Sequence, residues 1–453
     1  MTLRAITGAT VLQHDDAWTP AFNMDVVMSG DSIVAYGPGA AADYLEAETT
    51  DGHNLLLTPG LVNAHCHSAE ALARGRATDS GLDGWLPALA DVDTLSRDDI
   101  SLAVDLCAVE QPRSGVTSVV DHFRQLPATL DAGEAASAAW EKSGLRAMVA
   151  LMIRDRANPD GTAVGAAHSG PPPRSSDLLE LANLWLNGAP QTPGVVRGLG
   201  PSAVIRCTEA LLAMLADLAT RHGAPFHVHV DETADQAEQA QHLFDGNSAL
   251  ATLGTLGALG PRTSLVHCVH ISGADIEMLS ETGTTAVHCP VANQRLGSGI
   301  APVSAMQRSG VSVSLATDGA ASNDSQSMTE VVKAALLLNR TVPTEETWLT
   351  PRDVLDMVFR PGIRAFLGQD APNSGMICVG APADIAAFDL TEPTLMPAND
   401  LAAQFALAGG SLRARHVWVR GALRLANGNP VGIDLDRLAD RVRARSQRLA
   451  KAA

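Results

Sequence analysis

Short apolar runs alternate with helical stretches through the middle of the chain, between residues 58 and 375. Eight runs have the length and composition of buried strands: 61–65, 116–120, 145–153, 195–199, 225–230, 264–269, 284–287 and 311–316. Helical patterns lie between them, for example at 131–142, 209–221 and 274–281. Strands that alternate with helices pair in parallel, so the pattern predicts an α/β fold, a (β/α)8 TIM barrel. The chemistry of such a barrel gathers at the C-terminal ends of its strands.

Both ends of the chain have a different pattern, that of short strands separated by turns. Residues 1–57 contain strand candidates at 5–12, 24–28 and 32–36, and similar strands return at 383–390 and 416–423. We therefore expect residues 1–57 and 376–453 to form one small β-sandwich domain, with the barrel of residues 58–375 inserted between its halves. The charged segment 434–453 is expected to be a surface helix. A chain of 453 residues also exceeds what one core usually supports, about 250 to 300 residues.

Histidines and carboxylates stand at the predicted ends of four strands. The first strand ends in His65 and His67, whose side chains point to the same side of an extended strand, about 6.6 Å apart. The fifth strand runs into residues 227–233 (HVHVDET), the sixth into 265–270 (LVHCVH) and the eighth into 315–319 (LATDG). One His-x-His pair is weak evidence for a metal, but the barrel would bring all four groups to one mouth.

Five motifs in order resemble the amidohydrolase superfamily, in particular its cytosine, guanine and adenosylhomocysteine deaminases and s-triazine chlorohydrolases. They are residues 59–67 (PGLVNAHCH), 229–233 (HVDET), 267–270 (HCVH), 288–302 (HCPVANQRLGSGIAP) and 316–323 (ATDGAASN). The resemblance extends over nearly the whole chain. It implies a metal-dependent hydrolase of carbon–nitrogen bonds other than peptide bonds, and members of this branch often form homo-oligomers. Residues 1–6 lack the pattern of a signal peptide, so a cytoplasmic location is expected.

The resemblance also implies a role for each matched residue. His65, His67, His229 and Asp318 would hold one divalent metal ion, with zinc expected and iron, cobalt or manganese as alternatives. Asp318 would also take a proton from the attacking water, Glu232 would protonate the ring nitrogen, and His267 would stabilise the tetrahedral centre. His227 competes with His229, and His270 with His267. His229 is preferred because it lies nearer the strand end and has Glu232 three residues on, as in the family. His267 is preferred because the earlier residue of that pair matches the family.

The lysines argue against a binuclear centre. Lys142, Lys333 and Lys451 are the only lysines of the chain, and none falls near the fourth strand, where two-metal members of the superfamily use a carboxylated lysine. One metal per chain is therefore expected.

Substrate-binding residues are less strongly indicated by the sequence. The candidates are Trp85 after the first strand, His122 near the end of the second, Ser202 after the fourth, His288 at the end of the seventh, and Asn323. Relatives that act on adenosine-type nucleosides resemble one another in a histidine at the Ser202 position. The serine found here therefore weakens the argument that the substrate is a nucleoside. The loop 154–176 above the mouth is a lid or a variable insertion.

Charge and composition limit the classes of molecule that the protein can bind. The net charge of −18 and the lack of a basic stripe exclude nucleic acid, and no apolar run is long enough to span a bilayer. Six scattered cysteines without a Cys-x-x-Cys pair favour reduced thiols. The prediction is a mononuclear aminohydrolase that deaminates a small nitrogen heterocycle such as a pyrimidine, purine, pterin or s-triazine. The alternatives are hydrolysis of a urea, carbamate or anilide, dechlorination of a chlorinated triazine, and a non-catalytic binding protein on the same fold.

Overall fold

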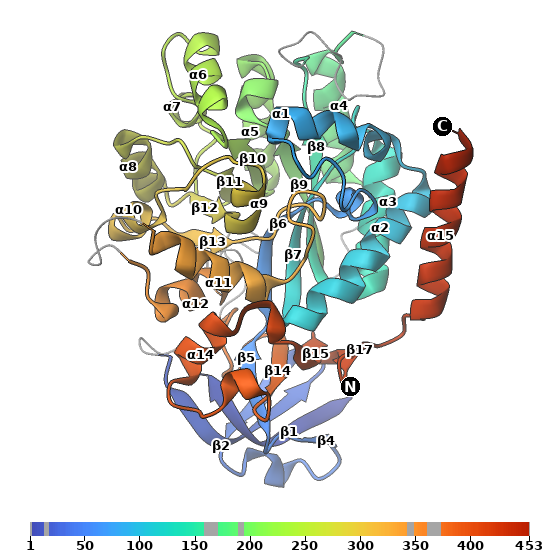
Figure 1. Cartoon of the computed structure of the whole chain (residues 1–453), viewed down its shortest axis with the longest axis vertical. Helices are drawn as coiled ribbons and strands as arrows, with labels where there is room; N and C mark the ends of the chain where they lie inside the picture. Colours follow the sequence, from blue (N-terminus) through green and yellow to red (C-terminus); the bar gives the residue numbers. More distant parts are fainter. Residues whose placement is uncertain are drawn as a thin grey trace.

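The structure, a computed structural model, describes residues 2–12, 18–157, 171–188, 194–341, 348–359 and 373–452. Eight parallel strands form the barrel predicted from the sequence, with helices around it (Figure 1). They are β6 (Leu61–Cys66), β7 (Val116–Phe123), β8 (Arg146–Ile153), β9 (Val195–Pro201), β10 (Phe226–Val230), β11 (Thr263–His267), β12 (Thr285–His288) and β13 (Val313–Leu315). Each strand coincides with one of the eight predicted runs.

The barrel closes where β6 meets the end of β13, the two outermost members of the strand order. The side chain of Asn63 makes this connection: its Oδ1 accepts from the backbone N–H of Thr317 at 3.0 Å, and its Nδ2 donates to the Thr317 hydroxyl at 2.8 Å. The backbone N–H of Asp318 donates to the carbonyl of His65 at 3.1 Å. The barrel seam therefore lies directly beside two of the predicted metal ligands.

The helices are positioned by side-chain caps placed shortly after the strands. Thr129, Thr208 and Thr233 each accept a backbone N–H at the start of α3, α5 and α6, which satisfies one of the unpaired donors of the first turn. The helices of the barrel region are α1 (Leu82–Trp85), α2 (Arg97–Glu110), α3 (Leu130–Ser143), α4 (Ser175–Asn187), α5 (Glu209–His222), α6 (Ala234–Leu243), α7 (Ala249–Thr255), α8 (Gly273–Thr282), α9 (Pro290–Arg295), α10 (Val303–Arg308), α11 (Met328–Asn339) and α12 (Pro351–Phe359).

Strands from both chain ends join in one mixed sheet at the bottom of Figure 1. Its members are β1 (Leu3–Leu12), β2 (Pro20–Ser29), β3 (Ser32–Gly37), β4 (Glu48–Asp51), β5 (Leu55–Pro59), β14 (Ile385–Asp389), β15 (Ala414–Val419), β16 (Ala422–Ala426) and β17 (Asn429–Pro430). The antiparallel pair of β5 and β14 connects the two ends. Ile6, Val26, Leu57, Ile385 and Trp418 belong to one buried cluster, so this unit has its own core. The separate β unit built from both ends is confirmed.

After β14 the chain forms α14 (Leu401–Ala408), and after β17 it leaves the sheet as α15 (Leu435–Ala452), which packs on α2 of the barrel. Arginines of α15 form ion pairs with aspartates of the barrel region: Arg445 lies 3.2 Å from Asp91, and Arg448 lies 3.0 Å from Asp99. Arg445 is 5% exposed, so α15 is docked on one face.

None of the helices in the described ranges is long and apolar enough to cross a membrane. The predicted loop 154–176 falls mainly on residues 158–170, which lie outside the described residues.

Candidate active site

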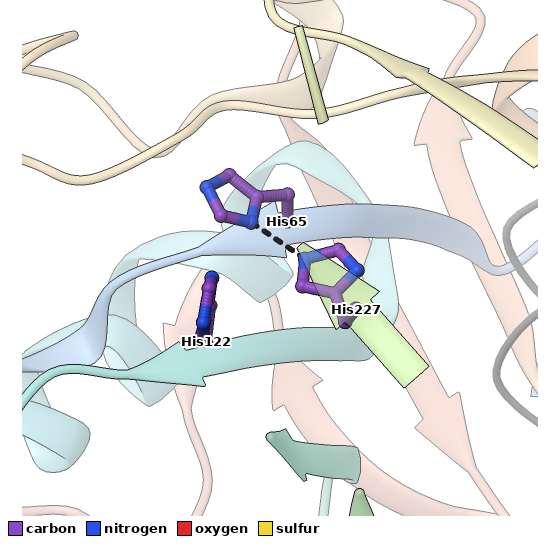
Figure 2. A group of neighbouring side chains, drawn as sticks. All are labelled: His65, His122 and His227. Atoms are coloured by element: carbon purple, nitrogen blue, oxygen red, sulfur yellow. Dashed lines mark hydrogen bonds between the residues drawn. The ribbon is translucent and has the colours of Figure 1, made fainter. Parts of the chain in front are cut away.

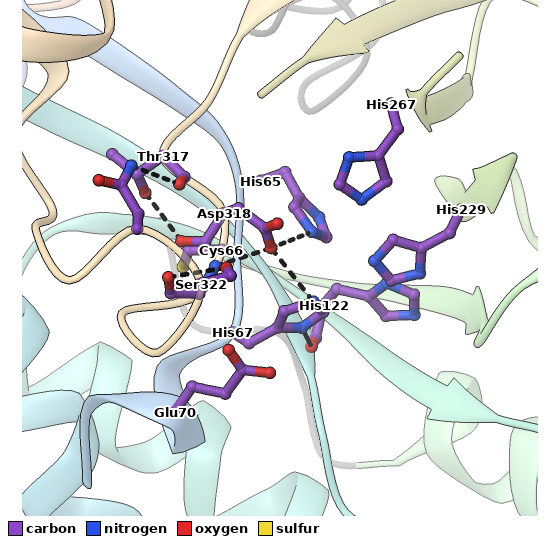
Figure 3. A network of polar contacts seen from close by, with 12 residues as sticks. His65, Cys66, His67, Glu70, His122, His229, His267, Thr317, Asp318 and Ser322 are labelled. Carbon is purple, nitrogen blue, oxygen red and sulfur yellow. Dashed lines mark hydrogen bonds and ion pairs between the residues drawn. The ribbon is translucent and has the colours of Figure 1, made fainter. Parts of the chain in front are cut away.

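The C-terminal ends of three strands bring the four predicted ligands together at one side of the barrel (Figure 3). His65 lies near the end of β6 and His67 directly follows it, His229 comes from β10, and Asp318 follows β13. Asp318 Oδ1 is 3.2 Å from Nε2 of His65 and 3.5 Å from Nε2 of His67. Nitrogens of His65, His67 and His229 lie within 4.8 Å of one another.

The second ring nitrogen of each histidine is held by a neighbouring group. Nδ1 of His67 donates to the carbonyl of His122 at 2.7 Å, and Nδ1 of His229 donates to the carbonyl of Ser202. A carbonyl can only accept, so both rings carry their proton on Nδ1 and leave a free lone pair on Nε2. Such outer partners orient and activate metal-binding histidines.

His65 is held by a histidine relay (Figure 2). Its Nδ1 lies 2.8 Å from Nε2 of His227, and Nδ1 of His227 lies 2.6 Å from the Ser264 hydroxyl. Nε2 of His65 is buried and has no hydrogen-bond partner among the described residues. A buried nitrogen without a partner is costly, and a metal ion at this place would satisfy it.

Burial also keeps these imidazoles neutral. It lowers the pKa of His65 and His67 well below the usual value, and for each ring a neighbouring histidine has the same effect. Burial and the charge of His267 lower the pKa of His229 to about 4. Three neutral imidazoles and a carboxylate form the donor set that suits zinc and similar divalent ions, so the residues fit one metal ion.

The competing residues are engaged elsewhere. Both ring nitrogens of His227 have partners, whereas Nε2 of His229 stays available. His270 is exposed and bonds through Nε2 to the carbonyl of Ser298, whereas His267 is 2% exposed. Among the described lysines, Lys142 lies on α3 and Lys333 on α11, away from β9.

Glu232 and His267 face each other beside the ligands. Oε2 of Glu232 is 3.6 Å from Nε2 of His267, and Oε1 accepts from the Ser298 hydroxyl at 3.1 Å. Asn293 Oδ1 lies 2.9 Å from His267 Nδ1 and fixes the ring. Burial raises the pKa of Glu232, the charge of Asp318 raises it further, and His267 opposes both. These groups can hold and transfer a proton near the ligands.

Backbone strain is concentrated at the same strand ends. His267 (φ 74°), Asp318 (φ 65°) and Asp231 (φ 43°) adopt the left-handed region, which costs a non-glycine residue about 1 to 3 kcal/mol. Strain that persists at a polar, buried site indicates a functional constraint.

The predicted substrate-binding residues surround the same centre. Trp85 is buried and donates through Nε1 to the carbonyl of Ala321 at 3.0 Å, and Ser202 directly follows β9. His288 ends β12, and its Nδ1 has no partner in the described part of the chain. Asn323 donates to the carbonyl of Thr317 at 2.7 Å, while its Oδ1 is likewise without a partner.

His122 lies inside the barrel rather than on a loop, because β7 continues to Phe123. Its ring is fully buried, its Nε2 lies 3.0 Å from the Gly200 carbonyl, and it stacks on His229 with the ring centres 4.8 Å apart. With its carbonyl also bound to His67, this residue contacts two of the predicted ligands.

The sequence reasoning gave no role to several residues that the structure places here. Asn293 and Ser298 lie inside residues 288–302, one of the five family motifs, and this membership was the one indication in the sequence that they belong to the site. Asp121 accepts from Ser68 and Trp140 and fixes the turn after His67. Glu70, in that same turn, is 1% exposed, and nothing in the pattern distinguished it.

Comparisons with known proteins agree with this geometry. The chain is 32% identical over 456 residues to the 5-methylthioadenosine/S-adenosylhomocysteine deaminase of Halobacterium salinarum (99% of this chain, 98% of the relative). It is 30% identical over 449 residues to the enzyme of that name from Pelotomaculum thermopropionicum, with 98% of both chains covered. Such relatives confirm the prediction of an aminohydrolase.

Solved structures are similar over the whole chain. An adenosine deaminase from Xanthomonas campestris with bound zinc matches with a TM-score of 0.85 and 26% identity, covering 99% of this chain and 98% of that one. A variant of the atrazine chlorohydrolase TrzN from Arthrobacter aurescens, in complex with zinc and atraton, matches with a TM-score of 0.88 and 25% identity, covering 98% and 99%.

The amidohydrolase family profile matches residues 56–424, which include the whole barrel and all the strand ends described above. The chain therefore belongs to the amidohydrolase family and is a hydrolase that acts on carbon–nitrogen bonds other than peptide bonds.

Proposed function

We propose that this protein is a mononuclear zinc-dependent deaminase of a small nitrogen heterocycle. The observation that carries the proposal is the convergence of three Nε2 lone pairs and one carboxylate, with Glu232 and His267 beside them. His65, His67, His229 and Asp318 would hold the metal. A divalent ion there supplies a nucleophile at neutral pH, because it acidifies a water molecule.

The protein groups then move protons and hold the reacting centre. Asp318 accepts a proton from the attacking water through its carboxylate. Glu232, whose pKa is raised by burial, carries a proton that it delivers to the ring nitrogen next to the attacked carbon. Nε2 of His267 faces the same space and stabilises the tetrahedral centre, and Asn293 keeps this ring in place. The carbon–nitrogen bond then breaks: ammonia leaves with the proton that Asp318 accepted, and the hydroxyl proton of the tetrahedral centre returns to Glu232.

The pocket residues would bind the heterocycle. We assign this role to Trp85, Ser202, Asn323 and His288, of which the last two retain an unused polar atom. His122 likewise retains an unused atom, Nδ1, and we assign it to substrate binding and to positioning of His67 and His229. The relatives' names point to an adenosine-type purine, whereas Ser202 departs from the histidine of such enzymes.

Elemental analysis of the purified protein, coupled to an ammonia-release screen over heterocyclic amines, tests this function. We expect about one zinc per chain and ammonia from a ring amine. Metal without ammonia on any amine would contradict deamination and favour hydrolysis of an amide, carbamate or chloride.

Substitutions separate the metal from the proton transfer. Glu232→Gln should keep the metal and lose most turnover, whereas Asp318→Ala and His67→Ala should also lose metal. The exposed Glu281 on α8 offers a matched control, since Glu281→Gln should change neither. Full activity of Glu232→Gln would refute the proton-transfer role.

We further propose a cytoplasmic location and a homo-oligomeric assembly. All six cysteines are free thiols, which suits a reducing compartment. The oligomeric state remains a prediction, to be measured by light scattering.

A further inference from the structure

Glu70 sits on a rigid turn next to the metal ligands. It belongs to the 3₁₀ turn η2 (Ser68–Leu72), whose first residue bonds to Asp121 through both its backbone N–H (2.9 Å) and its hydroxyl (2.6 Å). The backbone N–H of Glu70 donates to the carbonyl of His67 at 3.0 Å. The position of this side chain is therefore tied to that of a predicted ligand.

The carboxylate of Glu70 is buried without a hydrogen-bond partner. Both oxygens are inaccessible to solvent, and neither bonds to any group in the described ranges. The nearest cation, Arg124, is 3.8 Å away and beyond hydrogen-bond distance, because its Nε is bound to Asp93 at 2.7 Å. Burying a carboxylate that forms no hydrogen bond is unfavourable even with a cation 3.8 Å away, so a ligand that provides the missing donors would stabilise it.

This carboxylate faces the catalytic centre (Figure 3). A Cβ atom at Gly319, the residue after Asp318, would lie only 1.8 Å from Glu70 Oε2, so the glycine leaves the space that the carboxylate occupies. Burial raises the pKa of Glu70, Arg124 opposes this, and the charges of Asp318 and Glu232 raise it further. Glu70 thus shares one space with the groups proposed to carry out the reaction.

We propose that Glu70 is a specificity-determining residue that binds N–H donors on the substrate ring. The inference rests on the proposed function and narrows its substrate class. The preferred substrate carries a ring N–H or a second amino group in addition to the amino group that leaves, as in guanine-like, pterin-like or diamino heterocycles.

The chemistry of the ring edge explains this preference. A carboxylate presents two acceptor oxygens and pairs with adjacent N–H donors, as in amidines and guanidines. Adenine offers only its leaving amino group as an N–H donor on the six-membered ring, and its ring nitrogens are acceptors that repel a carboxylate. An unpaired buried group discriminates strongly against ligands that cannot satisfy it.

Two measurements on the zinc-loaded protein test the inference. The first compares kcat/KM for 2,6-diaminopurine and adenine, which differ by one amino group. The second uses calorimetry to compare benzamidine with benzamide, planar probes of similar shape that require no turnover and differ in donor number and in charge, since benzamidine is a cation at neutral pH. We expect at least a tenfold preference for the richer donor in both pairs. Glu70→Met should abolish both preferences, and Glu70→Gln should reduce them.

Thermal unfolding distinguishes binding from a structural role. If the carboxylate serves a ligand, Glu70→Met should not lower the unfolding temperature, since the lost carboxylate forms no hydrogen bond and Arg124 keeps its bond to Asp93. The inference is overturned if the wild type does not prefer the richer donor, or if Glu70→Met keeps that preference. It is also overturned if Glu70→Met unfolds at a lower temperature and binds benzamidine and benzamide equally weakly. Benzamidine binding that depends on Glu70, without ammonia release from any heterocycle, would support the inference and refute the proposed function.

Discussion

Substitution of Asn63 tests how the barrel seam supports the active site. Asn63→Ala removes the acceptor for the Thr317 N–H and the donor to Gln111 Oε1, which lies 3.1 Å from Nδ2. Asn63 and Thr317 are both fully buried, so water cannot replace these bonds. Each of the two stranded polar groups costs about 1 to 3 kcal/mol, which gives a total loss of about 2 to 6 kcal/mol.

The expected shift in unfolding temperature follows from the chain length. The entropy of unfolding is about 2.1 cal/mol/K per residue, so a cooperative unit of 453 residues shifts by about 1 °C per kcal/mol. Asn63→Ala should therefore lower the midpoint by about 2 to 6 °C in differential scanning calorimetry. Thr317→Val, which removes a hydroxyl but keeps the N–H bond to Asn63, should have a smaller effect of about 1 °C.

The same variant should weaken metal binding, because the residue after Thr317 is Asp318. Zinc added to metal-depleted wild-type protein should raise its unfolding midpoint, because zinc binds the folded state. We expect this rise to be smaller in Asn63→Ala. Unchanged stability and an unchanged zinc effect would refute the view that the Asn63 side chain closes the barrel and aligns the ligands.

Two further predictions concern other parts of the molecule. Arg445→Ala should lower the unfolding midpoint by about 1 to 3 °C, because it removes a buried side chain that packs α15 on the barrel and contacts Asp91 and Asp99. Arg448→Ala, whose side chain is exposed, should change the midpoint by less than about 1 °C, and equal effects would contradict the docking of α15. Metal content after dialysis should stay constant as the pH falls from 8 to about 5 and decline towards pH 4, because the lowered pKa of His229, about 4, keeps its imidazole neutral over that range. Loss of metal with a midpoint near pH 6.5, the ordinary value for histidine, would show that burial does not protect the ligands.

The barrel was predictable because its strands are short, apolar and separated by amphipathic helices. Parallel strands buried on both faces leave a continuous apolar signal, and each predicted run coincides with a strand. The proximity of the candidate ligands was predictable because a barrel places strand ends at one mouth, so that His65 and Asp318 lie close together although they are far apart in sequence.

Other parts of the site depend on contacts that one sequence does not reveal. The choice between His227 and His229 rested on a motif, and the physical reason is the Ser264 hydroxyl, which occupies the last free nitrogen of His227. The interior position of His122 follows from the length of β7, and strand ends are uncertain by a few residues. Glu70 stands out only once its missing partners are known.

The docking of α15 has a practical consequence for work with the protein. Asp91, which Arg445 contacts, lies in η3 (Leu86–Thr94), and this turn continues directly from α1, which ends at Trp85. The last helix of the chain thus braces the loop that carries a predicted pocket residue. We expect an affinity tag fused after α15 to disturb the contacts of Arg445 and Arg448 with the barrel, and so to raise KM without changing the metal-binding residues. Kinetic comparisons among variants should therefore use protein tagged at the other end or with the tag removed.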